Sequence, residues 1–180
     1  MFIKFSEEVQ HLLKNAKIEM QELCHPFVGS EHLLLSILKH NNHVSKILEE
    51  YHVNYSVFKK KTIKSIGIGN NKNNCFIYTP LLKRIIEEAM LDTKESNNKE
   101  VNLNTLFLAI LNEGEGVAIR ILASLNVDID KLYDEFSKKE IKNIEGIKLD
   151  CLEKNGPNKI EEDGTNITKE NKHNTIEEKK

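Results

Sequence analysis

The chain has 180 residues, enough for one domain of ordinary size and a tail. Its 26 basic and 28 acidic residues leave a net charge of −2, which argues against the clustered basic excess of a nucleic-acid-binding protein. Three dispersed cysteines indicate free thiols, so we expect a reducing, cytoplasmic setting, and no apolar run is long enough to cross a membrane.

Four helices are predicted in the first half of the chain. Ser6 is a suitable N-cap for the first, which should end before His25-Pro26. Gly29-Ser30 caps the second, a turn at residues 41–42 leads to a short third, and a fourth is expected from about residue 54 to residue 66. These predictions depend on apolar residues at helical spacing: Val9, Leu12, Leu13, Ala16, Met20, Leu33, Leu34, Ile37, Leu38, Val44, Ile47, Leu48, Val57 and Phe58.

Four more helices are predicted after a Gly- and Asn-rich connector at residues 67–74. The first of them begins with Thr79 as N-cap and Pro80 at the first helical position. The others are expected at residues 103–111, 117–125 and 128–139, and no segment is a convincing strand. Apolar residues between 141 and 152 indicate at most a short, weak helix. The segment 143–180 is expected to be a disordered polar linker or tail.

The two halves repeat each other. At an offset of 73 residues Val9 matches Leu82 and Val28 matches Val101, and after one extra residue the offset becomes 74, so that Leu48 matches Leu122. Repeated helical units usually bury their apolar faces against each other. The sequence therefore predicts an all-α fold of two tandem four-helix repeats with pseudo-two-fold symmetry, repeat one at residues 1–67 and repeat two at 78–142.

Four polar residues at predicted helix starts are candidate ligand-binding residues, one pair for each repeat: Ser6 with Glu31, and Thr79 with Asn104. A hydroxyl at a helix N-terminus lies beside unsatisfied N–H groups and favours an anion such as phosphate. A carboxylate favours a guanidinium, which it can bind through two parallel hydrogen bonds. The alternative is purely structural, with Ser6, Ser30 and Thr79 as caps and Glu31 as a first-turn acid.

Catalytic and metal-binding alternatives receive little support. The P-loop motif is absent, and Gly67-Ile68-Gly69 lacks its lysine and its strand-to-helix setting. No Cys or Asp accompanies His32, His40 and His43 at metal-ligand spacing. Cys24 and His25 are adjacent at a helix end, where side chains rarely face each other. We therefore expect a protein without catalytic residues, metal or cofactor.

The combination of the two repeats with three motifs resembles the N-terminal repeat domain of Clp unfoldases, ClpC-type chaperones in particular. The motifs are Val-Gly-Ser-Glu-His-Leu-Leu-Leu at 28–35, Tyr-Thr-Pro at 78–80 and Glu-Gly-Glu-Gly-Val-Ala at 113–118. The resemblance covers about residues 1–142. It implies an all-helical docking module that passes client and adaptor proteins to an AAA+ ring, which threads them into a protease.

The resemblance further implies phosphoarginine binding, with Ser6 and Glu31 in one site and Thr79 and Asn104 in the other. The second repeat departs from the family pattern because Asn104 offers a neutral amide where a carboxylate is usual, so we expect that site to be weak. The chain would be the N-terminal part of a longer unfoldase whose ATPase modules follow. The alternative is a free-standing adaptor or regulator without ATPase activity.

Overall fold

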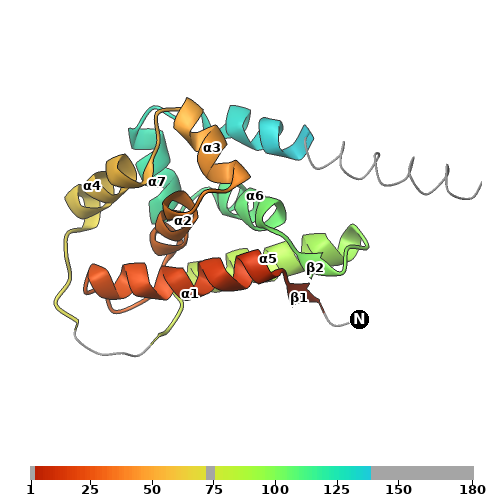
Figure 1. The fold of residues 1–180 in the computed structure, drawn as a ribbon, viewed down its shortest axis with the longest axis horizontal. Coiled ribbons are helices and arrows are strands. Elements are labelled where there is room, and N and C mark those ends of the chain that lie inside the picture. Colours follow the sequence, from red (N-terminus) through yellow and green to blue (C-terminus); the bar gives the residue numbers. More distant parts are fainter. Residues whose placement is uncertain (1–2, 72–75, 139–180) are drawn as a thin grey trace, which may run out of the picture.

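The computed structural model describes residues 3–71 and 76–138, and within them the chain forms eight helices (Figure 1). Seven carry labels: α1 Glu7–Glu22, α2 Ser30–Lys39, α3 His43–Glu50, α4 Tyr55–Ile66, α5 Pro80–Glu95, α6 Leu103–Glu113 and α7 Val117–Ser124. The eighth covers residues 129–138. The eight-helix prediction is therefore confirmed, whereas the predicted tail at 143–180 and the weak helix at 141–152 lie outside the described residues.

The helices begin where capping side chains satisfy their first backbone N–H groups. Ser6 Oγ accepts the N–H of Val9 at 3.3 Å, and Thr79 Oγ1 accepts the N–H of Leu82 at 3.1 Å. Asn42, Asn54 and Asn102 cap α3, α4 and α6 in the same way. Of the predicted Gly29-Ser30 cap of α2, Gly29 is confirmed as the N-cap, whereas Ser30 is the first residue of the helix.

Two short strands correct the expectation of a chain without strands. β1 (Lys4–Phe5) and β2 (Glu100–Val101) pair in parallel, with Phe5 opposite Val101. Two-residue strands are too short to produce an alternating pattern that the sequence could reveal. A second parallel bridge joins Val28 and Tyr78.

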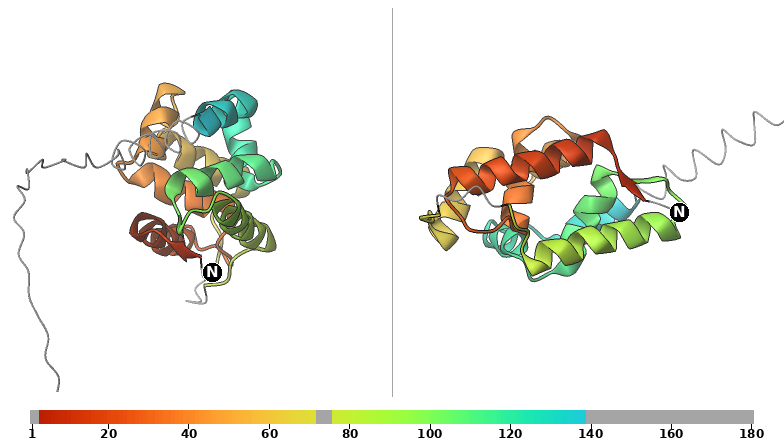
Figure 2. Two further views of the ribbon diagram at one scale, coloured as in Figure 1. Left: turned by 90° about the vertical axis from the view of Figure 1, so that its right-hand side faces the viewer. Right: turned by 90° about the horizontal axis from the view of Figure 1, so that it is seen from below.

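The internal repeat relates these two pairings to each other. The offset of 73 residues converts Phe5 into Tyr78 and Val28 into Val101, so the two pairings exchange places. Hydrogen bonds repeat the relation: Ser6 N–H donates to Val101 O at 3.0 Å, and Thr79 N–H donates to Val28 O at 2.9 Å. Each repeat therefore begins by pairing with the other repeat, and α1 and α5 line the two long sides of the molecule (Figure 2).

One continuous hydrophobic core holds the repeats together. Helix α1 packs mainly on α2 and α5 mainly on α6, while α7 contacts both α2 and α4 across the repeat boundary. The helix at 129–138 joins this core through Leu132 and Phe136, which are fully buried. None of the helices among the described residues combines the length and apolarity needed to cross a membrane.

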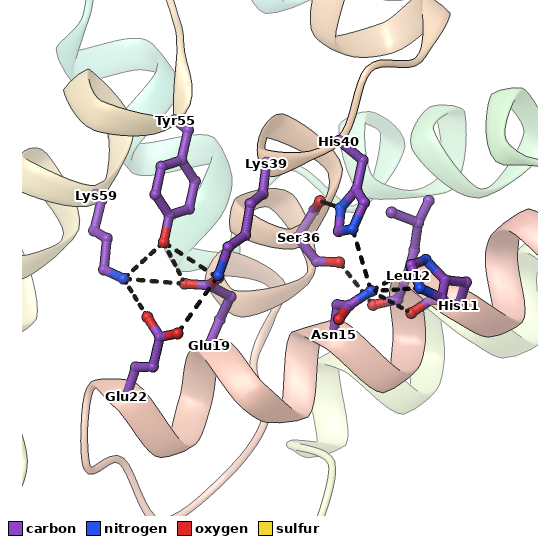
Figure 3. A network of polar contacts seen from close by, with 10 residues as sticks. All are labelled: His11, Leu12, Asn15, Glu19, Glu22, Ser36, Lys39, His40, Tyr55 and Lys59. Carbon is purple, nitrogen blue, oxygen red and sulfur yellow. Dashed lines mark hydrogen bonds and ion pairs between the residues drawn. The ribbon is translucent and has the colours of Figure 1, made fainter.

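A buried carboxylate links α1, α2 and α4 (Figure 3). The fully buried Glu19 accepts hydrogen bonds from Lys39 at 2.6 Å, from Lys59 at 3.3 Å and from Tyr55 OH at 3.0 Å. Glu22 on the next turn shares both lysines. Because hydrogen bonds from Lys59 and Lys39 and their positive charges act on Glu22, its pKa lies below the ordinary value. All of these charges are paired within the cluster, so we assign it a structural role.

Candidate functional site

Glu31 and Thr79 lie at the same place, between the two repeats. Both residues line a cavity of about 200 Å³, and both also line an adjoining cavity of about 220 Å³. The pairing of Val28 with Tyr78 explains this arrangement, because it joins the chain before α2 to the chain before α5. Glu31 comes from the first turn of α2 and Thr79 is the N-cap of α5.

The expected pairing of Ser6 with Glu31 within one repeat is therefore corrected. Ser6 begins α1 and is bound to Val101 of repeat two. Glu31 lines the same cavity as Thr79. The ring of the neighbouring Tyr78 lies under Nζ of Lys17, which is about three turns beyond Ser6 along α1. The pairing failed because the repeats exchange their N-terminal strands, which the residue offset alone does not reveal.

Ser6 is placed beside the start of α6 instead. Its N–H bonds to Val101, which immediately precedes the α6 cap Asn102, and Asn104 is the second residue of that helix. By the same correction, Thr79 does not share a site with Asn104. The pseudo-two-fold symmetry thus relates a Thr79–Glu31 site to a Ser6–Asn104 position.

Three helix starts meet at the first of these cavities, the one of about 200 Å³, which we call the polar cavity. It is lined by Gly29, Ser30, Glu31, Thr79, Leu81, Glu115, Gly116, Val117 and Arg120. These residues come from the beginnings of α2, α5 and α7. Each helix N-terminus carries a partial positive charge of about half an elementary charge. The polar cavity therefore combines an anion-attracting field with one buried carboxylate and one guanidinium.

Two close approaches of the backbone shape the polar cavity. The carboxylate of Glu31 lies against Gly29, where a Cβ atom would collide with both of its oxygens. At Gly116 a Cβ atom would come within 2.7 Å of Ser30 Oγ. That hydroxyl accepts the N–H of Ala118 at 3.4 Å and so caps α7 from the other repeat. Glycine at position 29 leaves room for the carboxylate of Glu31, and glycine at position 116 lets the starts of α2 and α7 approach each other.

Glu31 is an unusual carboxylate because it is only 7% exposed and faces the cavity. Burial raises its pKa above the ordinary value, while a hydrogen bond from its own backbone N–H and the charge of Arg120 act in the opposite direction. Its oxygen lies 3.3 Å from His32 Nδ1. That nitrogen accepts the N–H of Gly29, so the contact is not an ion pair. A ligand guanidinium would supply the full positive partner that Glu31 lacks.

A chain of hydrogen bonds fixes the backbone behind Glu31. Gly29 N–H donates to His32 Nδ1 at 2.9 Å, His32 Nε2 lies 2.8 Å from His25 Nδ1, and His25 Nε2 lies 3.1 Å from Gly67 O. Because the carbonyl can only accept, each Nε2 must carry the proton and donate. The chain therefore requires both imidazoles to be neutral, and it ties the loop before α2 to the end of α4.

This arrangement predicts acid sensitivity of folding. Burial, with a smaller effect of His25, lowers the pKa of His32 from 6.5 to about 3. Below pH 6.5 the unfolded chain binds a proton that the folded chain excludes, so stability is complete above that pH and falls as the pH decreases toward 3. Between pH 7 and pH 5 the loss from this residue should be about 2 kcal/mol.

Urea unfolding of the unmodified protein and of His32→Gln at the two pH values measures this effect. The variant should lose about 2 kcal/mol less between pH 7 and pH 5, whereas His11→Gln, at an exposed position, should behave like the unmodified protein. Equal losses in the unmodified protein and His32→Gln would contradict the assignment.

The hydrogen-bond chain also explains the one cluster of possible metal ligands among the described residues. His25, Glu31 and His32 have donor atoms within 4.8 Å of one another. A metal-bound histidine normally donates its other ring N–H, but His32 Nδ1 is an acceptor here. Both nitrogens of His25 are engaged as well, so His25 does not serve as a base for Cys24.

The histidines that the sequence suggested as metal ligands have separate partners. His40 binds Ser36 O at 2.7 Å and its ring lies against His11, whereas the ring of His43 packs on Phe136. Sequence reasoning did not include Arg120 or Ser30 among the ligand-binding residues. Their role depends on α7 of repeat two reaching the start of α2, and the repeat offset carried no signal of that contact.

Comparisons with known proteins agree with this architecture. The sequence model of the Clp repeat (R) N-terminal domain matches residues 4–122 and 77–151. The ATP-dependent Clp protease ATP-binding subunits ClpC of Staphylococcus saprophyticus and Staphylococcus aureus are each 31% identical over 132 residues. Those matches cover 73% of this chain and 16% of each relative, so the chain spans about one sixth of the relatives' length.

Solved structures share the fold at low sequence identity. The N-terminal domain of ClpD from Arabidopsis thaliana superposes with a TM-score of 0.62 at 14% identity, covering 76% of this chain and 96% of that one. The ClpV N-domain in complex with a VipB peptide superposes with a TM-score of 0.58 at 22% identity, covering 74% and 85%. These likenesses concern the arrangement of helices alone.

Proposed function

Because the chain belongs to the Clp repeat N-terminal domain family, we propose that it is the substrate- and adaptor-recognition domain of a ClpC-type AAA+ unfoldase and reads phosphoarginine-marked proteins. In this proposal residues 1–142 form the double-repeat domain, and residues 143–180 link it to ring modules in a cytoplasmic chaperone. A tethered module raises the concentration of captured clients near its ring. The ring would hydrolyse ATP, whereas this domain would only bind.

The buried carboxylate of Glu31 supports the phosphoarginine assignment most strongly. Glu31 lines the same two cavities as Thr79, and three helices begin around the first of these cavities. Phosphoarginine carries a phosphate on a guanidinium group, and these are the two chemistries that the polar cavity provides for. The guanidinium would bind Glu31, and the phosphate would lie toward the helix starts and Arg120.

In this proposal the second cavity, of about 220 Å³, binds the client residues on either side of the phosphoarginine. It is lined by His25, Pro26, Phe27, Glu31, Ile66 and Thr79. Phe27 is 48% exposed and Ile66 is 39% exposed, so apolar surface is available directly beside the polar cavity. An apolar side chain next to the phosphoarginine in a client would contact this surface and add affinity by burial.

The two pseudo-symmetric positions should differ in strength. The Ser6–Asn104 position lacks the carboxylate, and exchanging a charge-assisted hydrogen-bond pair for a neutral one costs about 1–3 kcal/mol. Calorimetric titration with phosphoarginine should therefore give one strong site per chain. Asn104→Glu should add a second. Free arginine and phosphoserine should bind far more weakly. Two equal strong sites in the unmodified protein would refute the asymmetry, and no binding at all would refute the phosphoarginine proposal.

A further inference from the structure

A third cavity, of about 410 Å³, lies within repeat two and shares no lining residue with the polar cavity. The end of α6, α7 and the helix at 129–138 form it, and we call it the α6–α7 cavity. Its apolar lining residues are buried or half-buried: Leu111, Ile119 and Ile129. Its polar lining residues and its tyrosine are exposed: Asn112, Asp130 and Tyr133.

The electrostatics of the α6–α7 cavity favour a cation. Helix α6 ends at Gly114, which also lines the cavity, so the last carbonyl groups of the helix bring their partial negative charge there. Among the described residues, neither the last turn of α6 nor the lining of the cavity contains a basic residue. Asp130 adds a full negative charge, and the amide of Asn112 donates to the carboxylate of Glu88. A positive group from outside would therefore be stabilised here.

Repeat one shows what occupies the corresponding place in the other half of the molecule. The offsets of 73 and 74 residues relate three lining residues to a cluster in repeat one: Asn112 to Lys39, Ile129 to Tyr55 and Tyr133 to Lys59. In that cluster the two lysine Nζ atoms lie 5.5 Å and 5.1 Å from the centroid of the Tyr55 ring, and both bind Glu19 (Figure 3). Repeat two has the corresponding helix ends without the two lysines, and a cavity is open there.

We propose that the α6–α7 cavity binds a lysine side chain of a partner protein. The methylene groups of that lysine would lie on Leu111 and Ile119, as long basic side chains commonly do on apolar surface. Its ammonium group would bind Asp130 and lie against the ring of Tyr133. The partner thus supplies the cation that repeat one supplies from its own chain. This gives the domain a second recognition surface, which works independently of phosphoarginine.

Nuclear magnetic resonance titration with N-acetyl-lysine methylamide tests the proposal. The matched probe is the norleucine compound, which keeps the four-carbon chain and lacks the ammonium group. The lysine probe should shift the amide signals of Gly114 and Asp130 and should bind at least about fivefold more tightly than the norleucine probe. Phosphoarginine should not displace it. Unchanged signals at millimolar lysine probe, or equal affinities for the two probes, would overturn the proposal.

Two aspartates on the same helix separate a local contact from a general effect of charge. Asp130→Asn should weaken binding of the lysine probe about three- to fivefold, a modest factor because the carboxylate is exposed to water. Asp134→Asn removes the same charge one turn further along, at an exposed position that does not line the cavity, and should leave the affinity unchanged. Equal losses in the two variants would show that the attraction is not specific to the cavity.

Substitutions at Tyr133 test the comparison of the repeats. Tyr133→Lys places a lysine at the position that corresponds to Lys59, so it should occupy the cavity from within and abolish binding of the lysine probe. Tyr133→Gln removes the ring without supplying a cation and should keep part of the affinity. Melting temperatures check that both variants are folded. Binding to Tyr133→Lys with the affinity of the unmodified protein would overturn the proposal and leave the phosphoarginine site untouched.

Discussion

Replacing Glu31 by glutamine should reduce phosphoarginine affinity by about 2–3 kcal/mol, or roughly 30- to 150-fold. Glutamine keeps the shape of the side chain but has one neutral acceptor oxygen in place of a charged pair. The loss should be large because the carboxylate is only 7% exposed, so that water screens its attraction for a guanidinium weakly.

Removing a buried charge has a second effect that separates binding from folding. The pKa of Glu31 is raised by burial, so its charge is costly in the folded domain. We therefore expect Glu31→Gln to be at least as stable as the unmodified protein while it binds ligand poorly. Calorimetry and urea unfolding of the same samples measure both quantities. Asn104→Gln is the matched control and should alter affinity less than about twofold; a comparable loss there would contradict the assignment.

Truncating Phe136 to alanine should destabilise the whole domain by about 3–4 kcal/mol. The ring is fully buried, lies 4.8 Å from the ring of Phe107 in α6 and also contacts His43 in α3. It therefore joins the helix at 129–138 to both repeats. A single cooperative unfolding transition should shift to lower urea concentration as one unit, because the core is continuous.

The adjacent turn of the same helix provides the control. Tyr133 is 38% exposed, and Tyr133→Ala should cost less than about 1 kcal/mol. Circular dichroism during urea unfolding compares the two variants. A loss below about 1 kcal/mol for Phe136→Ala would mean that the helix at 129–138 is not part of the folded core.

Much of the fold could be predicted because the information is local. Apolar spacing marks the helices, and cap residues such as Ser6 and Thr79 mark where they begin. The repeat offset correctly matched the two halves. The sequence did not reveal which repeat each N-terminal segment pairs with, since that pairing is formed by two-residue strands through backbone hydrogen bonds.

The structure brings two of the four candidate residues, Glu31 and Thr79, to the same cavity, but not in the pairing expected from the sequence. Glu31 and Thr79 were both identified from helix-start chemistry, but each was assigned a partner from its own repeat. Ser30 and Arg120 acquire their roles only through contact between α2 and α7, which are far apart in the sequence. A contact of that kind depends on tertiary packing, for which helical periodicity and capping preferences carry no information.

In the proposed function the binding site is built from both repeats, with Thr79 of one beside Glu31 of the other. The most direct test compares phosphoarginine affinity in Thr79→Val and Ser6→Val, two variants that each remove an N-cap hydroxyl and should lose similar stability. Thr79→Val should weaken the strong site about tenfold, and Ser6→Val should leave it within about twofold. The reverse result, with Ser6→Val weakening the site and Thr79→Val sparing it, would mean that Ser6 and not Thr79 belongs to the strong site.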